Sequence, residues 1–206
     1  MLHEIITKSL KNVTKSIFPA SIVSATVAVP SSKQIVVNST HTFENFEKVH
    51  VFGFGKAVLA MAEQVYQDFA DKSIPLGFFE LVVPIGIQFN NPELKSKIQV
   101  HYGAANNLPD EAAFAGTLKI LNTMRYQVSP KDLVIILVSG GGSALSCCPI
   151  ENVTVAQKNS MTKRLASQGA TIQELNHVRK CFSKVKGGRI LNYLPPGNRP
   201  FYFELV

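Results

Sequence analysis

The sequence has no tryptophan and only three cysteines in 206 residues. Because their number is odd and two of them, Cys147 and Cys148, are adjacent, they form neither a disulfide framework nor a Cys-x-x-Cys metal site, and a reducing compartment fits this usage. The chain also lacks an apolar run of the roughly 18 residues that a membrane span needs, a visible signal peptide, internal repeats and low-complexity tracts. With these classes excluded, a composition of 46% hydrophobic and 17% charged residues indicates one large globular domain, or one and a half.

Acidic residues are scarce in the last part of the chain. Residues 151–206 contain nine Lys and Arg but three Asp and Glu, whereas residues 1–150 contain 12 and 11. The net charge of +7 is therefore concentrated in one region. Because the basic residues are not interleaved with aromatic ones and no nucleic-acid-binding motif is present, a small phosphorylated ligand is a better interpretation than nucleic acid, and no membrane partner is expected.

The first 17 residues have an amphipathic pattern, with apolar side chains opposite Lys8, Lys11 and Lys15. A mitochondrial presequence can have this pattern, but Glu4 is present and arginine is absent, so a first helix docked on the domain is favoured over a transit peptide. We therefore expect the protein to be cytoplasmic, with a mitochondrial location as the alternative.

Strand and helix patterns alternate along the rest of the chain. Apolar runs predict strands at 34–38, 48–54, 76–83, 98–102 and 132–138. Helices are predicted at 56–69 and 109–125, and two more begin with the capping boxes Thr154-x-x-Gln157 and Thr171-x-x-Glu174. This alternation predicts an α/β fold, with a Rossmann-like, mostly parallel sheet and helices on both faces.

Ligands of such sheets bind where strands give way to loops at their carboxyl ends, and two junctions of this kind stand out. The first is the segment 51–56, in which Gly53 and Gly55 precede a predicted helix. Lys56 would lie in the first turn of that helix, where the helix dipole disfavours a cation unless an anion, such as a bound phosphate, is nearby. Glycines that serve only a tight turn, with Lys56 in solvent, are an equally good interpretation, since the spacing is not that of a Walker loop.

The second junction is a run of three glycines that follows the strand at 132–138. The candidate phosphate- or substrate-binding residues here are Ser139, Gly140, Gly141, Gly142 and Ser143. Three glycines in succession are costly to order and a simple turn rarely needs more than one, so an anion-binding loop of bare backbone is favoured over a structural turn. Neither serine has the flanking glycines of a Gly-x-Ser-x-Gly nucleophile elbow, which argues against an α/β-hydrolase.

A third element is the helix predicted over 171–189. Its apolar positions lie on one face, and Asn176, Arg179 and Lys186 lie on the other at helical spacing. Such a face is usually solvated, but acidic residues do not balance these cations after Glu174, and an arginine can hold a carboxylate or phosphate with two hydrogen bonds. Asn176, Arg179 and Lys186 are therefore candidate ligand-binding residues, whereas no metal-binding residue is predicted.

Together these motifs resemble one family, the ATP-dependent glycerate 2-kinases, whose distal domain is of the MOFRL type. The motifs that carry the resemblance, in the order expected for that family, are Phe52-Gly-Phe-Gly-Lys-Ala57, Asn107-Leu-Pro-Asp-Glu111, Leu137-Val-Ser-Gly-Gly-Gly-Ser-Ala-Leu145 and Gly169-Ala-Thr-Ile-Gln-Glu-Leu-Asn176, followed by Val178-Arg-Lys180 and Lys186-Gly-Gly-Arg189. The resemblance is to the animal branch and covers about residues 1–190.

The resemblance implies transfer of the γ-phosphoryl group of ATP to the 2-hydroxyl of D-glycerate, which gives 2-phosphoglycerate and ADP, with Mg²⁺ as cofactor. Carried onto this sequence, the family's lysine is Lys56, the predicted catalytic residue, which would stabilise charge on the transferring phosphoryl group. The loop from Ser139 to Ser143 would hold phosphate or the substrate carboxylate. The implied partner is this small-molecule substrate.

The resemblance stops near Ile190. Members of the family continue into a second half that closes the cleft, whereas here the second domain is missing and residues 191–206 read as a divergent tail that we expect to be irregular. We therefore expect residues 1–190 to fold as the N-terminal Rossmann-like domain, and a truncated isoform of this kind to be weakly active or inactive. The alternative is a noncatalytic module that keeps the fold and binds an anion or a partner.

Overall fold

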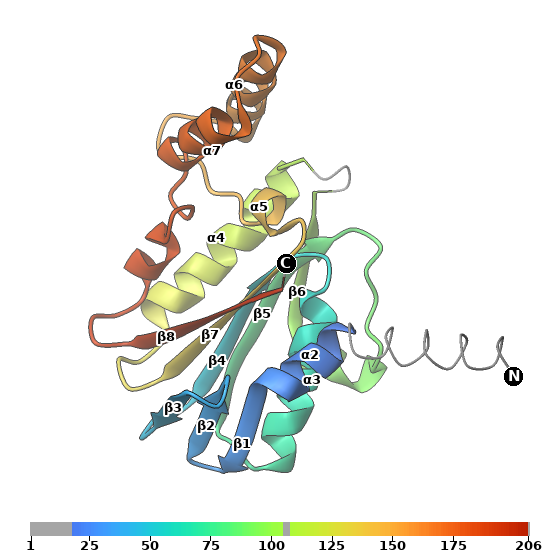
Figure 1. Cartoon of the computed structure of the whole chain (residues 1–206), viewed down its shortest axis with the longest axis vertical. Helices are drawn as coiled ribbons and strands as arrows, with labels where there is room; N and C mark the ends of the chain where they lie inside the picture. The colour runs from blue at the N-terminus through green and yellow to red at the C-terminus, as the bar shows by residue number, and fades with distance from the viewer. Residues whose placement is uncertain (1–17, 105–107, 206) are drawn as a thin grey trace, which may run out of the picture.

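A five-stranded parallel sheet forms the centre of the computed structural model, which describes residues 18–104 and 108–205 (Figure 1). Its strands, in the spatial order β6-β5-β4-β7-β8, are β6 (Gln99–Gly103), β5 (Leu76–Pro84), β4 (Val49–Phe54), β7 (Leu133–Ser139) and β8 (Arg199–Leu205). The predicted α/β fold with a Rossmann-like parallel sheet is confirmed. The helix expected within the first 17 residues lies outside the described residues, as does Asn107.

Helices cover both faces of this sheet because successive side chains of a buried strand point to opposite sides. Val51 belongs to a hydrophobic cluster with α3 (Val58–Asp71), whereas the next residue, Phe52, belongs to a second cluster with α4 (Glu111–Tyr126). Both helices correspond to helices predicted from the sequence. The two clusters hold the central strands rigidly in place, which fixes the positions of the loops at their carboxyl ends.

The segment before β4 and the β5–β6 connection contain shorter elements. These are α2 (Pro19–Thr26), β1 (Val27–Ser31), β2 (Gln34–Val37), β3 (His41–Glu44) and the 3-10 turn η1 (Pro92–Ser96). The strands β1, β2 and β3 form a separate antiparallel sheet. Val23, Ile35 and Val37 extend the hydrophobic cluster around α3, so this small sheet supports that face of the domain.

Beyond β7 the chain forms α5 (Gly142–Leu145), α6 (Val155–Ser167), α7 (Ile172–Cys181) and the 3-10 turn η2 (Arg189–Tyr193). α6 and α7 extend past the carboxyl ends of the strands, at the top of Figure 1. Both predicted capping boxes are confirmed: Thr154 and Thr171 each accept the N–H of the residue three positions on, and that residue's side chain accepts the N–H of the threonine. None of the described helices is both long enough and apolar enough for a membrane span.

The helix predicted to run to Arg189 ends at Cys181. The hydroxyl of Ser183 accepts the N–H of Lys186 at 3.2 Å, which turns the chain, and the guanidinium of Arg189 donates to the carbonyl of Ser183 at 2.8 Å. These local side-chain bonds offer the backbone an alternative to the helix. Lys186 therefore lies in the loop after α7 and not on its surface.

The structure also differs from the prediction of an irregular tail over residues 191–206. Residues 199–205 form β8, which pairs with β7 in parallel from Leu133↔Arg199 to Ser139↔Leu205. Without this strand, β7 would present an unpaired edge, and the aromatic segment Phe201-Tyr-Phe203 suits a strand. Tertiary pairing, which the local sequence does not reveal, decides the structure of this segment.

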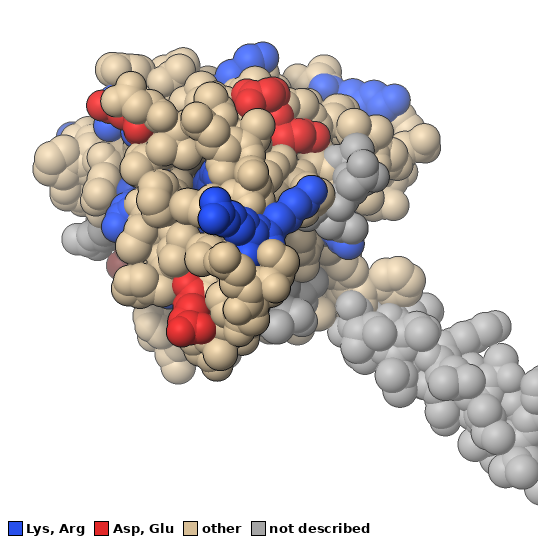
Figure 2. Space-filling view, turned by 90° about the horizontal axis from the view of Figure 1, so that it is seen from above, with Lys and Arg blue, Asp and Glu red and all other residues tan. Residues whose placement is uncertain are grey.

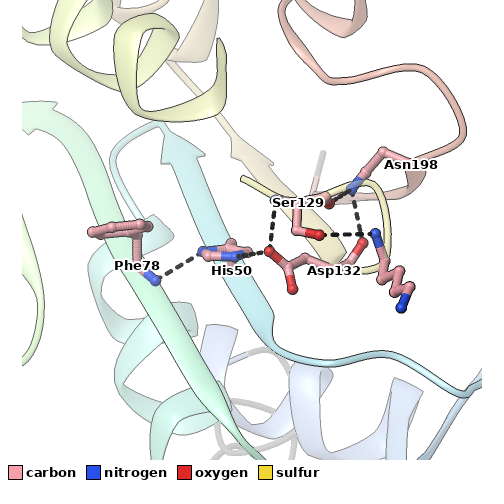
Figure 3. Close-up of polar contacts among 6 residues, drawn as sticks. His50, Phe78, Ser129, Asp132 and Asn198 are labelled. Carbon is pink, nitrogen blue, oxygen red and sulfur yellow. Dashed lines mark hydrogen bonds and ion pairs between the residues drawn. The ribbon is translucent and has the colours of Figure 1, made fainter. Parts of the chain in front are cut away.

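A buried polar network joins the strands at the amino end of the sheet (Figure 3). The ring of His50 accepts the N–H of Phe78 through Nδ1 at 3.0 Å and donates from Nε2 to the carboxylate of Asp132 at 2.9 Å. Burial lowers the pKa of His50 although the bond to Asp132 opposes it, so the ring is neutral. Asn198 donates to the carbonyls of Ser129 and Asp132, which ties the segment before β8 to the same network.

Candidate active site at the carboxyl ends of β4 and β7

The candidate site lies at the switch point of the sheet, where the direction in which successive strands are added reverses. β4 is the central strand; the next two strands along the chain lie on one side of it, and β7 and β8 lie on the other. The loops after β4 and β7 therefore leave the sheet side by side, which is the usual ligand position in doubly wound sheets. These loops are the two glycine-containing junctions that stand out in the sequence.

The two loops are joined by hydrogen bonds. The N–H of Lys56 donates to the carbonyl of Gly140 at 2.9 Å, and the N–H of Ala57 donates to the hydroxyl of Ser139 at 3.0 Å. Gly55 has a φ of +151°, and a Cβ at this position would lie 2.1 Å from the Ser139 hydroxyl oxygen. Glycine is therefore required at position 55 for the two loops to meet, and Ser139 fastens the start of α3 to the end of β7.

The three glycines of the β7 loop have different roles. A Cβ at Gly142 would lie 2.7 Å from the carbonyl oxygen of Phe54, so this glycine allows close packing. Gly141 has a φ of +84°, which glycine adopts readily, and a Cβ at Gly140 would meet no atom within 4 Å. Gly140 and Gly141 are exposed, and together they present accessible backbone to the solvent side of the loop.

The positions of Lys56 and Gly53 differ from those predicted, which were the first turn of the helix for Lys56 and the ligand-binding loop for Gly53. Lys56 precedes the N-cap residue Ala57 and so lies just before the helix, not in its first turn. Its exposed side chain passes over Gly141, with Cγ and Cε 3.3 Å from the position that a Cβ on Gly141 would take. Gly53 is buried inside β4, where a Cβ would lie 2.7 Å from the side chain of Leu81, so Gly53 serves packing and does not reach the cleft.

The second wall of the site comes from α7 and the loop that follows it. Arg179 donates to the hydroxyl of Ser143 at 2.6 Å and to the side-chain oxygen of Asn176 at 2.9 Å, and Lys186 donates to the Ser143 hydroxyl at 2.9 Å. These residues and the glycine loop line an open cleft of about 480 Å³, together with Lys180. The structure thus brings together the predicted loop 139–143 and all three residues predicted after Thr171.

Cations crowd this cleft. Burial, with smaller contributions from Lys158 and Arg179, lowers the pKa of Lys186 to about 7. Burial also lowers the pKa of Lys158. Within the part of the chain that the structure describes, no Asp or Glu lines the cleft. Figure 2, which views the molecule from this end, shows Lys and Arg side chains gathered near the middle of the face. A bound anion would relieve the repulsion among these cations.

Lys158 is a buried residue of this region that was not predicted from the sequence. It lies on α6 and is only 3% exposed, close enough to Lys186 to lower the pKa of that residue. The sequence contains a weak signal for it: Lys158 is three positions after Val155, so the two share one helical face, and Val155 is buried. A lysine on the apolar face of a helix is unusual enough to mark a candidate ligand-binding residue.

The family described as Domain of unknown function (DUF4147) matches residues 2–200, which is nearly the whole sequence. The chain belongs to this family. Its DUF4147 match extends through the glycine loops, α6, α7 and the start of β8, so each element of the candidate site is part of the family domain.

Several proteins similar to this chain are named glycerate kinases. The chain is 42% identical over 165 residues to "Glycerate kinase" of Rattus norvegicus and 38% identical over 165 residues to that of Homo sapiens, and each alignment covers 77% of this chain and 31% of the relative. The crystal structure of glycerate kinase from Thermotoga maritima superposes with a TM-score of 0.76 at 28% identity, covering 99% of this chain and 44% of that one. The resemblance inferred from the motifs is confirmed, and the chain spans about a third of the length of these curated relatives.

Proposed function

We propose that this DUF4147 chain contributes one wall of a glycerate 2-kinase active site, in which the γ-phosphoryl group of ATP is transferred to the 2-hydroxyl of D-glycerate. The bond between the γ-phosphorus and the bridging oxygen of ADP breaks, a bond from the 2-hydroxyl oxygen to phosphorus forms, and the hydroxyl proton is released. The products are 2-phosphoglycerate and ADP. The small-molecule ligands that this proposal requires are D-glycerate and ATP.

One observation carries the proposal. The loops after β4 and β7 meet at the switch point of the sheet, and Lys56 passes over the exposed Gly141 of the second loop. Arg179 and Lys186 contact Ser143 at the end of that loop. Phosphoryl transfer depends on positioning and on stabilising negative charge, so a cleft whose described lining includes bare backbone and cations but no Asp or Glu suits it. The names of the glycerate kinases similar to this chain support glycerate as the substrate.

We assign the cations different tasks in this reaction. Lys56 would contact the transferring phosphoryl group, because this residue directly follows Gly55 in the β4 loop and its side chain is exposed. Arg179 and Lys186 would hold the opposite side of the bound anion, and their bonds to Ser143 keep them in place before ligand binds. Pre-positioned charges of this kind need no rearrangement as the transition state forms.

Magnesium does not fit the described residues. Mg²⁺ prefers carboxylate and water oxygens, whereas residues 18–104 and 108–205 contain no group of three His, Cys, Asp or Glu that could hold a metal ion. We propose that Mg²⁺ comes with the phosphates of ATP, and that the residues of this chain act on the phosphates and not on the metal.

Release of ADP in the presence of D-glycerate and MgATP tests the proposal. Replacing Lys56 by alanine should lower kcat/KM by at least about 100-fold, because a charge that stabilises the transition state is lost. The matched control is Lys72→Ala, which removes an exposed lysine at the other end of α3 and should leave turnover unchanged. No turnover at high enzyme concentration would contradict the proposal for this chain and favour a noncatalytic module that binds anions.

The compartment is also proposed. All three cysteines are free, as is usual in a reducing compartment, and among such compartments we propose the cytosol rather than the mitochondrial matrix. Fractionation of cells that express the untagged chain distinguishes the two locations.

A further inference from the structure

Lys158 is a buried cation without a hydrogen-bond partner among the described residues. Its side chain is 3% exposed, and no atom of the described residues forms a hydrogen bond with its Nζ. Lysine is almost never fully buried unless it is paired, because the ammonium group loses its hydration. Burying the Lys158 ammonium group therefore destabilises the fold, and no hydrogen bond from the described residues offsets the lost hydration.

Lys158 is one of the residues that line a cavity next to the main cleft. This cavity has a volume of about 130 Å³, and its other basic lining residues are Lys163, Arg179 and Lys186. No Asp or Glu is among its described lining residues. Lys158 and Lys186 line the same cavity, and Lys158 is one of the charges that lower the pKa of Lys186. An anion in the cavity would pair with Lys158 and reduce this repulsion.

Ser143 connects the cavity with the cleft. It lines both, and its hydroxyl accepts hydrogen bonds from Arg179 and Lys186, which also line both. A ligand with two acceptor groups could therefore occupy the two spaces at once, with Ser143 between them. The three glycines of the loop line the larger space only.

Packing does not explain the charge on Lys158. α6 is attached to the domain by Val155, which is buried, and by Asn159, whose amide donates to the carbonyl of Pro109 at 2.7 Å. Its start is held by the capping box at Thr154. None of these contacts uses the ammonium group, and an apolar side chain of similar length would fill the same volume at a lower cost.

We propose that the cavity around Lys158 is a subsite for the carboxylate of the 2-hydroxy acid substrate, beside the glycine loop where the phosphoryl group binds. The small volume suits a carboxylate on a short carbon chain, and Leu108, Pro109 and Ala144 supply an apolar surface for that chain. The larger cleft of about 480 Å³ suits the phosphates of a nucleotide. This assignment rests on the proposed function, since D-glycerate is the substrate it names.

Binding of D-glycerate to the full chain, measured by calorimetry without nucleotide, tests the subsite. Lys158→Met should weaken D-glycerate binding by about 10- to 100-fold, as expected for the loss of a charged hydrogen bond. The matched control is Arg164→Met, which removes an exposed cation from the same helix outside both cavities and should change the affinity less than about twofold. The melting temperature of Lys158→Met should rise, because an unpaired buried charge is removed.

Inorganic phosphate is the second probe, because it distinguishes a carboxylate subsite from a phosphate subsite. If Lys158→Met no longer binds inorganic phosphate but binds D-glycerate with unchanged affinity, the carboxylate assignment is overturned. Unchanged D-glycerate affinity in a folded Lys158→Met variant overturns the subsite altogether. Lys158→Gln, which is polar but uncharged, provides the same comparison if the methionine variant does not fold.

The turnover assay separates this inference from the proposed function. ADP release that depends on Lys56, with a KM for D-glycerate unchanged in Lys158→Met, would overturn the subsite and leave the kinase proposal standing. D-glycerate binding that requires Lys158, in a chain without turnover, would support the subsite and contradict the kinase proposal.

Discussion

Lys186 carries a charge that titrates close to neutral pH, so the affinity of the cleft for anions should depend on pH. Its pKa is lowered to about 7, chiefly by burial and further by Lys158 and Arg179. Below pH 7 the side chain is protonated and attracts an anion; above pH 7 it is increasingly neutral. We therefore expect D-glycerate, whose own charge is constant in this range, to bind more weakly as the pH rises from 6 to 8.5. Calorimetry over this range measures the change.

The control for this pH dependence is Lys186→Met, in which the affinity should be lower at pH 6 and nearly constant up to pH 8.5. Binding to the unaltered chain near pH 8 should also take up a proton, because the anion raises the pKa of Lys186 again. Calorimetry in two buffers of different ionisation enthalpy detects that proton. A flat affinity profile without proton uptake would show that Lys186 is already charged throughout this range.

Individual residues differ in how well the sequence reveals them. Gly55 and the run from Gly140 to Gly142 could be predicted because glycine at a strand-to-loop junction typically allows a tight turn or a close approach of backbone. Gly53, in the same motif, proved to be a packing residue, since only the folded sheet places Leu81 against it. Lys158 could not be found from motifs, because its role depends on the burial of α6 against the domain.

At the scale of single elements, the cap of α7 links local stability to the candidate site. The N–H of Glu174 donates to the Thr171 hydroxyl, and the N–H of Thr171 donates to the Glu174 carboxylate at 2.8 Å. Thr171→Ala should therefore destabilise α7 by about 0.5–2 kcal/mol. Because α7 carries Arg179, anion affinity should fall as well. Hydrogen exchange of the α7 amides measures the first effect, and phosphate binding measures the second.

Thr171→Ser keeps the capping hydroxyl and should preserve both properties, whereas Thr154→Ala removes the equivalent cap of α6 and should leave the α7 amides protected. Fast exchange in α7 with undiminished phosphate binding would mean that Arg179 is held by its bond to Ser143 alone.

Elements were predicted well where their signals are local. Both capping boxes begin helices, and the apolar runs at 48–54, 76–83 and 132–138 are strands of the sheet. The end of α7 and the existence of β8 were not predicted. The first depends on the Ser183 hydroxyl and Arg189, and the second depends on the exposed edge of β7. Such tertiary bonds override the local pattern.

At the scale of the whole molecule, the two ends of the parallel sheet differ: one is an open cleft lined by cations, and the other is a buried hydrogen-bond network. The carboxyl end holds accessible glycines and mutually repelling cations around an open cleft. At the amino end, the network of His50 and Asp132 joins β4 and β5 to the segments that precede β7 and β8. The repulsion among the cations at the carboxyl end destabilises the domain, and the hydrogen bonds between strands at the amino end help to offset it.

The amino-end network should make the stability of the whole domain depend on pH through His50. Burial lowers the pKa of His50 in the folded chain, so below about pH 6.5 the unfolded chain binds a proton that the folded chain does not. Stability from this residue is present above that pH and is lost as the pH falls, by up to about 1.4 kcal/mol per unit until the lowered pKa is reached. Urea unfolding at pH 7.5 and pH 5.5 measures the loss.

His50→Gln should lower stability at pH 7.5 by about 1–3 kcal/mol, because the buried bonds to Asp132 and Phe78 are weakened or lost. It should also lose less stability than the unaltered chain between pH 7.5 and pH 5.5. Burial lowers the pKa of His101 as well, so a smaller dependence should remain in the variant. If the free energy of unfolding depended on pH identically in both proteins, the prediction would be contradicted, because the pKa of His50 would then not be lowered by folding.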